Sequence, residues 1–286
     1  MPRTPPDHRI ASARNRNRLA RVGSPPVPAV TLDLWHTLMY LEPGAEEEYM
    51  EGQAKIAREV LARSERLPGA PDLSEEALGQ IYEKVLADAV SAANEGRTVT
   101  PVAQIVEAAR LAGRVPDPEA FLRGLELEIR STKFQRAPGA LDLLKALTSD
   151  GYRLALISNT VGEPGAFLRP VLREMGFDGY VGAVVFSDEH PWTKPSPEIF
   201  RAALEPLGEV PVRAVHVGDG WSDVEGARRA RFRAAILYTG LHEYGARYKS
   251  LFLPDDWDRP PTPYRAARLE EVPEMVRTLL PPAPSK

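Results

Sequence analysis

The chain has 286 residues, of which 43% are hydrophobic and 27% are charged, so it is neither fibrous nor wholly disordered. Its formal net charge of −4 gives no reason to expect a nucleic acid or an acidic membrane as its main partner. The sequence has no cysteine and no apolar run near the roughly 20 residues that cross a bilayer, which excludes disulfides, thiol catalysis and a spanning helix. We therefore expect a cytoplasmic protein whose chemistry depends on carboxylates, hydroxyls, histidine and lysine.

The two ends of the chain and one late segment predict irregular structure. Residues 1–28 hold six arginines, six prolines and a single acid without any apolar period, which indicates a disordered basic tail. This stretch lacks the apolar core of a secretory signal. Leu253–Pro263 contains four prolines and is predicted to be a surface loop, and residues 281–286 are predicted to be a loose C-terminus.

Five short and nearly continuous apolar runs predict β-strands that are buried on both faces. These runs are Ala29–Leu34, Tyr152–Ser158, Ala183–Ser187, Ala214–Gly218 and Ala234–Tyr238. Helical patterns at Leu168–Met175, Glu198–Leu207 and Val224–Arg231 separate the last four. This alternation predicts an α/β fold with a doubly wound parallel sheet.

The roughly 100 residues between the first two runs, Tyr40 to Gln135, contain no convincing strand. Apolar residues recur there at three- and four-residue spacing, which predicts four helices at Glu46–Arg66, Ser74–Glu95, Pro101–Leu111 and Pro118–Arg130. Ser74 is a plausible N-cap of the second helix. We therefore predict a helical domain at residues 40–135, inserted into a core domain formed by residues 29–39 and 136–280.

Polar residues gather where the predicted strands end, which is where ligands bind in folds of this class. Asp33 and Thr37 follow the first run, Ser158 and Asn159 end the second, and Lys194 lies after the third. Asp219 and Asp223 follow the fourth run. Each is singly a common turn or cap residue, but together they place hydroxyls, carboxylates and a lysine at one edge of the sheet.

This set of side chains suits phosphoryl chemistry. Asp33, Asp219 and Asp223 form the kind of hard-oxygen site that Mg²⁺ prefers. Asp33 can attack phosphorus to give an aspartyl-phosphate while Mg²⁺ and Lys194 neutralise the phosphoryl charge. Thr37 and Ser158 can donate hydrogen bonds to the phosphoryl oxygens.

Four motifs in order now identify a family resemblance. Asp33–Leu38 matches the pattern D-x-D-x-T-L except at its third position, which is Trp35, and Ser158 lies in Leu-Ile-Ser-Asn-Thr. Lys194 begins Lys-Pro-Ser-Pro-Glu-Ile-Phe, and G-D-x-x-x-D-x-x-G-A spans Gly218–Ala227. Over about residues 29 to 280 the chain resembles hydrolases of the haloacid dehalogenase superfamily, and its helical insert resembles their C1 cap.

The resemblance implies a role for each matching residue. Asp33 would be the nucleophile, and Thr37, Ser158, Asn159 and Lys194 would bind the substrate. Asp219 and Asp223 would hold Mg²⁺ together with Asp33. The implied substrate is a small phosphorylated metabolite.

Trp35 departs from the family pattern. Phosphatases of the family carry a second aspartate at this position, which protonates the leaving group and then activates water. An indole cannot exchange a proton near neutral pH, so a general acid–base contribution of about 10²–10⁴ in rate has lost its usual carrier. Only the backbone carbonyl of Trp35 could still bind the metal.

Three interpretations follow from this departure. The favoured one is a phosphatase that borrows a proton carrier, for which His36 is the nearest titratable candidate in sequence. The second is a HAD-like protein that binds a phosphorylated ligand with little or no turnover. The third is a 2-haloacid dehalogenase, since those members also place an aromatic residue after the nucleophile. They are metal-free, however, and lack the acids that Asp219 and Asp223 retain.

Two further residues near these motifs have mainly structural interpretations. His216 lies inside the fourth strand and is predicted to be a packed core residue. Trp221 lies in the predicted metal-binding turn and could line the pocket, although packing between helix and sheet is the commoner use of such an aromatic residue.

Overall fold

The computed structural model describes residues 27–242 and 261–282, and its centre is a parallel sheet of six strands in the order β5-β4-β1-β6-β7-β8. The strands are β1 (Ala29–Leu32), β4 (Arg153–Ser158), β5 (Val181–Phe186), β6 (Ala214–Gly218), β7 (Ala234–Tyr238) and β8 (Arg265–Ala266). All five predicted strands are present, and β8 extends the sheet at one edge. The strand order reverses beside β1, because the chain passes from β1 to β4 on one side and later to β6 on the other.

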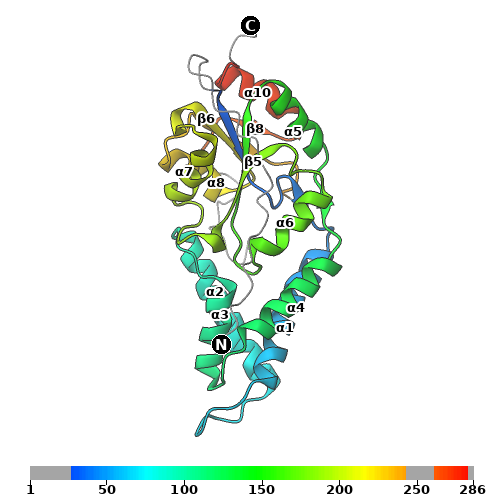
Figure 1. Cartoon of the computed structure of the whole chain (residues 1–286), viewed down its shortest axis with the longest axis vertical. Helices are drawn as coiled ribbons and strands as arrows, with labels where there is room; N and C mark the ends of the chain where they lie inside the picture. Colours follow the sequence, from blue (N-terminus) through cyan, green and yellow to red (C-terminus); the bar gives the residue numbers. More distant parts are fainter. Residues whose placement is uncertain (1–26, 243–260, 283–286) are drawn as a thin grey trace, which may run out of the picture.

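Helices cover both faces of this sheet, which confirms the doubly wound fold (Figure 1). Leu143, Leu168 and Val276 belong to one buried cluster, and Ile199 and Ala227 belong to a second. The first cluster thus includes side chains of α5 (Ala140–Ser149), α6 (Gly165–Glu174) and α10 (Val272–Leu279). The second includes side chains of α7 (Pro197–Leu204) and α8 (Trp221–Arg229). Strands between two apolar layers must be apolar on both sides, which explains their continuous hydrophobic runs.

Four helices between β1 and β4 form a separate unit at one end of the molecule (Figure 1). They are α1 (Ala45–Arg63), α2 (Glu75–Asn94), α3 (Pro101–Ala112) and α4 (Pro118–Ser131). Leu61, Tyr82, Ile105 and Phe121 pack into a buried cluster of their own. The predicted N-cap is present, since the Ser74 hydroxyl accepts a hydrogen bond from the backbone of Ala77 at 3.2 Å.

A two-stranded antiparallel ribbon joins this helical unit to the sheet. Its strands, β2 (Met39–Tyr40) and β3 (Gln135–Arg136), pair Met39 with Arg136 and Tyr40 with Gln135. The prediction that Tyr40 to Gln135 holds no strand is therefore wrong at both ends of that segment. Two residues are too few to show an alternating period, so the pairing could not be read from the sequence.

Three predicted irregular segments fall wholly or mostly outside the described residues. They are the basic tail at 1–28, the loop Leu253–Pro263 and the C-terminal residues 281–286. Within the described parts of the chain, no helix is both long enough and apolar enough to cross a membrane.

Candidate active site

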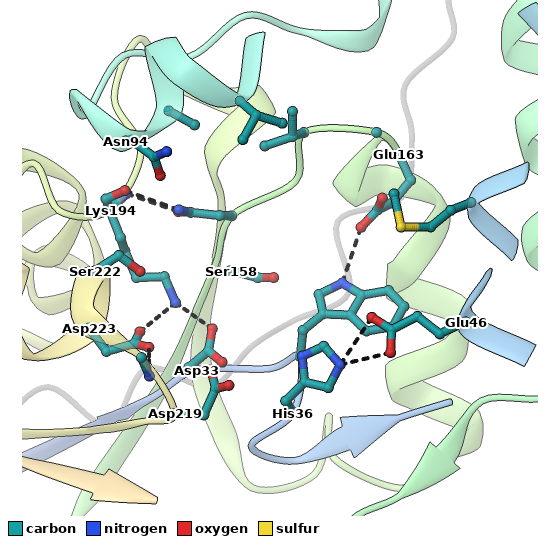
Figure 2. Close-up of a pocket in the computed structure, with 18 of the residues that line it drawn as sticks. Asp33, His36, Glu46, Asn94, Ser158, Glu163, Lys194, Asp219, Ser222 and Asp223 are labelled. Carbon is teal, nitrogen blue, oxygen red and sulfur yellow. Dashed lines mark hydrogen bonds and ion pairs between the residues drawn. The ribbon is translucent and has the colours of Figure 1, made fainter. Parts of the chain in front are cut away.

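The candidate site lies at the carboxyl ends of three neighbouring strands. Asp33 follows β1, Ser158 is the last residue of β4, and Asp219 follows β6. Lys194, from the loop before α7, and Asp223, from the first turn of α8, join them (Figure 2). All five residues line one pocket, so the structure brings together side chains that the sequence distributes over about 190 positions.

A tight turn presents Asp33 to the pocket. The Asp33 amide donates to the carbonyl of Val217 at 2.8 Å, which continues the sheet pattern one residue beyond β1. The chain then reverses, and His36 adopts a φ of 56°, a left-handed conformation that is uncommon for a residue with a side chain. The buried Thr37 hydroxyl donates to Asp33 Oδ2 at 3.1 Å. Thr37 therefore orients the candidate nucleophile and does not itself line the pocket.

Lys194 lies between two carboxylates. Its Nζ contacts Asp33 Oδ1 and lies 2.6 Å from Asp223 Oδ1, and all three side chains are buried. The Asn159 amide holds the lysine backbone in place, because Nδ2 donates to the Lys194 carbonyl at 3.0 Å and Oδ1 accepts from the Lys194 amide at 2.9 Å. Asn159 also lines the pocket. Its side chain positions Lys194, and its direct contact with substrate stays a prediction.

Three carboxylates form a compact acidic cluster. One oxygen from each of Asp33, Asp219 and Asp223 lies within 4.8 Å of the others. The approach of α8 to the sheet requires a glycine at Gly218, since a Cβ there would come within 2.2 Å of Asp223 Cγ. The geometry of this cluster thus depends on the glycine of the fourth motif.

His216 supports the cluster from inside the sheet. It is fully buried in β6, as predicted for a core residue. Its Nε2 lies 3.0 Å from Asp223 Oδ1, and its Nδ1 lies 2.8 Å from the Thr31 hydroxyl. Burial lowers the pKa of His216, against the opposing effect of the hydrogen bond with Asp223. The prediction of a packed core residue did not include this contact with Asp223.

The electrostatics of the cluster favour a bound cation. Burial raises the pKa of Asp33 to about 7, with Lys194 opposing the shift and the other two aspartates adding to it. Burial also acts to raise the pKa of Asp223, but Lys194 and His216 together, through their charges and hydrogen bonds, outweigh burial and hold this pKa below its usual range. When ionised, three carboxylates and one ammonium leave two uncompensated negative charges. A divalent cation with a preference for oxygen would neutralise them, so these residues fit Mg²⁺.

Ser158 provides an independent indication of a ligand. Its hydroxyl oxygen is buried in the pocket wall and has no hydrogen-bond partner among the residues that the structure describes. Leaving a buried polar group unpaired costs about 1–3 kcal/mol. A hydroxyl in that state beside Lys194 and Asp33 is positioned to donate to a bound anion.

The indole of Trp35 contacts a residue that sequence reasoning missed. Trp35 Nε1 donates to Glu163 Oε1 at 3.1 Å, and the amide of Gln53, from α1, lies 3.5 Å from the other oxygen. Burial is the main cause that raises the pKa of Glu163 to about 7, against the hydrogen bonds from Gln53 and Trp35. No motif or spacing marks Glu163, because its partners are 110 and 128 residues away in sequence.

His36 also pairs with the helical unit. Its Nε2 lies 3.2 Å from both carboxylate oxygens of Glu46, at the start of α1. His36, Glu46 and Glu163 all line the pocket on the side away from Lys194 (Figure 2). Trp221, for which packing was the favoured interpretation, is also part of the pocket wall.

Comparison with known proteins places the chain in a family. Residues 27–231 match the family model described as haloacid dehalogenase-like hydrolase. A phosphoglycolate phosphatase of Nitrosococcus oceani is 32% identical over 124 residues, which cover 43% of this chain and 54% of that protein. A plasmid-encoded phosphoglycolate phosphatase of Cupriavidus necator is 32% identical over 177 residues, which cover 60% of this chain and 75% of that protein. The first match thus spans only about half the length of the relative.

Solved structures support the fold. A HAD phosphatase from Thermococcus onnurineus superimposes with a TM-score of 0.57 at 20% identity, over 87% of this chain and 97% of that one. The family model covers most of the chain and includes Asp33, Ser158, Lys194, Asp219 and Asp223. The chain therefore belongs to the haloacid dehalogenase-like hydrolases.

Proposed function

We propose that this chain is a Mg²⁺-dependent phosphatase that acts on a small phosphorylated metabolite through an aspartyl-phosphate on Asp33. The observation that carries the proposal is the placement of Asp33 beside Lys194, two further aspartates and the Ser158 hydroxyl, which no described residue pairs. A nucleophile, a fixed positive charge and an unused donor at one point suit a tetrahedral anion.

The cation would be held by the acidic cluster. Asp33, Asp219 and Asp223 supply the carboxylates, and the backbone carbonyl of Trp35 is the further proposed ligand. When bound, Mg²⁺ would neutralise charge on the phosphoryl oxygens and on the nucleophile. Side chains of the protein would supply the nucleophile and the hydrogen-bond donors.

The proposed reaction has two displacements at phosphorus. In the first, a carboxylate oxygen of Asp33 bonds to phosphorus while the bond from phosphorus to the substrate alcohol breaks, and the departing oxygen takes up a proton. In the second, water attacks the phosphorus of the aspartyl-phosphate, which releases inorganic phosphate and restores Asp33. Lys194 and Ser158 stabilise the phosphoryl charge in both steps, and Thr37 orients Asp33 through its hydroxyl.

Trp35 sets the expected rate of these steps. Both displacements need a proton to move, and the side chain at the usual position of the proton carrier is an indole that donates to Glu163. Turnover should therefore be slow for substrates whose alcohol is a poor leaving group.

The relatives support phosphate-ester chemistry in general terms. Several relatives are named phosphoglycolate phosphatases. In three of them, the matching region covers 54% of the relative's length or less. The site residues and the names of these relatives together support the hydrolysis of a phosphate ester as the reaction class.

One observation favours a second candidate function. A protein that binds a phosphorylated ligand with little turnover would retain the acidic cluster and Lys194 but could tolerate Trp35. A 2-haloacid dehalogenase is less well supported, because the retained Asp219 and Asp223 have no role in metal-free chemistry.

One assay separates these functions. The protein is incubated with a panel of phosphomonoesters and 2-haloacids, each with Mg²⁺ or with EDTA, and released phosphate and halide are measured. We expect phosphate release that disappears in EDTA and in the Asp33→Asn variant. Halide release that persists in EDTA would establish the dehalogenase, and the absence of both products would favour the binding protein.

A further inference from the structure

The pocket has two chemically different ends. The phosphoryl end contains Asp33, Lys194 and Ser158 (Figure 2). The other end, which we call the alcohol end, is where the alcohol part of a phosphomonoester would lie. It contains His36, Glu46 and Glu163, together with apolar side chains of the helical unit.

Positive charge is concentrated at the phosphoryl end. Among the pocket-lining residues in 27–242 and 261–282, Lys194 is the only lysine or arginine. It is already bound between Asp33 and Asp223, so it cannot reach a second anion at the alcohol end.

The alcohol end carries two buried carboxyl groups. Glu46 and Glu163 are each 7% exposed. Glu163 accepts from Trp35 and Gln53, neither of which is charged. Glu46 lies 3.2 Å from His36, so the imidazole at this end is already paired with a carboxylate. The described residues of the alcohol end therefore offer no net positive charge to a ligand.

The rest of the alcohol end is apolar or aromatic. Tyr49 and Met50 come from α1, and Leu86 and Val90 come from α2. Trp35 lies against Tyr49 with ring centroids 6.0 Å apart. Such a surface can cover a short carbon skeleton, and aromatic rings beside carboxylates also attract an ammonium group.

We propose that this pocket selects phosphomonoesters whose alcohol is neutral or cationic, and that it discriminates against esters with a second anionic group. The inference rests on the proposed phosphatase function and adds the substrate class to it. Its physical basis is that a carboxylate at the alcohol end would be desolvated beside Glu46 and Glu163, and no lysine or arginine among the described residues lines that end to compensate it.

Three small esters of nearly equal size test this directly. They are 2-aminoethyl phosphate, 2-hydroxyethyl phosphate and 2-phosphoglycolate, which place a cation, a neutral hydroxyl and an anion at the same position. Each is measured as a competitive inhibitor of p-nitrophenyl phosphate hydrolysis with Mg²⁺ present. Inhibition constants report binding even if the alkyl esters turn over slowly. We expect 2-phosphoglycolate to bind at least tenfold more weakly than 2-aminoethyl phosphate, with the neutral ester between them.

A charge-introducing variant provides the complementary test. Met50 is half-buried in the pocket wall and has an unbranched side chain, so Met50→Arg places a cation at the alcohol end and Met50→Gln is the neutral control. Met50→Arg should strengthen 2-phosphoglycolate binding at least fivefold and weaken 2-aminoethyl phosphate binding, whereas Met50→Gln should leave the order of the three esters unchanged.

The possible failures are distinguishable. If p-nitrophenyl phosphate is hydrolysed and 2-phosphoglycolate binds as tightly as the other two esters, the inference is wrong and the phosphatase function stands. The same holds if none of the three esters inhibits. If p-nitrophenyl phosphate releases no phosphate, the proposed function fails and the inference fails with it.

Discussion

At the scale of single residues, Trp35 determines which substrates should react well. An aryl phosphate with an acidic phenol needs little protonation to leave, so it should react much faster than an alkyl phosphate. Hydrolysis of the aspartyl-phosphate should then limit turnover, and rapid-mixing measurements with p-nitrophenyl phosphate should show a burst of phenolate. Equal rates on aryl and alkyl esters would mean that another group supplies the proton.

Replacing Trp35 tests the same idea from the protein side. Trp35→Asp should raise turnover on alkyl phosphates by about 10²-fold or more. The Trp35 ring packs edge-on against Phe134, with ring centroids 5.6 Å apart. Because Trp35→Asp removes this packing, its free energy of unfolding should fall by up to about 3–5 kcal/mol. Trp35→Phe is the control that retains an aromatic ring without a proton donor, and its alkyl turnover should stay low. A gain in Trp35→Phe equal to that in Trp35→Asp would contradict the explanation.

His36 is the nearest alternative proton carrier, and its backbone limits which variants are informative. Alanine would be strained at a φ of 56°, whereas asparagine adopts this conformation readily. We expect His36→Asn to leave the ratio of aryl to alkyl turnover within about threefold of wild type, since the imidazole is paired with Glu46. A selective loss of alkyl turnover, measured as kcat/KM, would show that His36 delivers the proton.

Glu163 should make stability depend on pH. Its pKa of about 7 in the folded protein exceeds the ordinary 4.5, so the folded state binds the proton more tightly than the unfolded state does. Protonated Glu163 contributes on the order of 3 kcal/mol to the free energy of unfolding, and this contribution is complete below pH 4.5 and is lost as the pH rises to about 7. Urea unfolding in EDTA should therefore show a steeper decline for wild type than for Glu163→Gln over this range. Parallel pH profiles would refute the assignment.

The residues that could be predicted from sequence are those held by local motifs. Five of the site residues lie at the end of a recognisable strand or in a recognisable turn, so a parallel sheet predicts that they converge. They are Asp33, Ser158, Lys194, Asp219 and Asp223. The residues of the alcohol end could not be found in this way. Glu163 meets Gln53 across 110 positions, and nothing local to either residue encodes that contact.

At the scale of secondary structure, the strength of the hydrophobic period decides what could be predicted. Ala214–Gly218 and Ala234–Tyr238 match β6 and β7 residue for residue, because both strands are fully or nearly fully buried and apolar apart from His216. Helix α8 begins at Trp221, three residues before the predicted start at Val224, because its first turn holds the polar Asp223. Strand β8 has only two residues and gave no signal.

Replacing Gly218 tests whether the site depends on the close approach of Asp223 to the backbone of Gly218. In Gly218→Ala the new Cβ would overlap Asp223, so the first turn of α8 should move away from β6. We expect a loss of about 1–3 kcal/mol in stability and at least a tenfold loss of activity. Gly179→Ala is the matched control, since a Cβ there meets no atom within 4 Å. Gly218→Ala should unfold at a lower temperature and release phosphate more slowly than Gly179→Ala. Equal unfolding temperatures and equal rates for the two variants would contradict the explanation.

At the scale of the molecule, the helical unit encloses the site through contacts on several sides. Gln104 Nε2 donates to the carbonyl of Val161 at 2.6 Å, and the Thr98 hydroxyl donates to the carbonyl of Ser187 at 3.0 Å. Together with the contact of Glu46 with His36, these bonds hold α1 and α3 over the sheet edge. We propose on this basis that the helical unit is a cap domain that excludes water and determines which alcohol fits.

Mg²⁺ binding should stabilise the whole fold. A cation that binds only the folded state contributes RT ln(1 + [L]/Kd), about 2.7 kcal/mol at one hundred times Kd. Wild type should therefore unfold at a higher temperature in Mg²⁺ than in EDTA. Asp219→Asn should remove most of this increment, and Glu225→Gln, a carboxylate on α8 that pairs with Arg228 and Arg229, should retain it. If Mg²⁺ raises the unfolding temperature of Asp219→Asn as much as that of wild type, the cation binds elsewhere.

The most direct test of the proposed chemistry is to isolate the covalent intermediate. The protein is mixed with p-nitrophenyl phosphate and Mg²⁺, quenched in acid during the burst, digested, and analysed by mass spectrometry. Because Trp35 should slow hydrolysis of the aspartyl-phosphate, we expect a substantial fraction of the peptide that contains Asp33 to carry a phosphoryl group, and none in Asp33→Asn. Phosphate release by wild type with no phosphorylated Asp33 at any quench time would contradict the nucleophilic role of this residue.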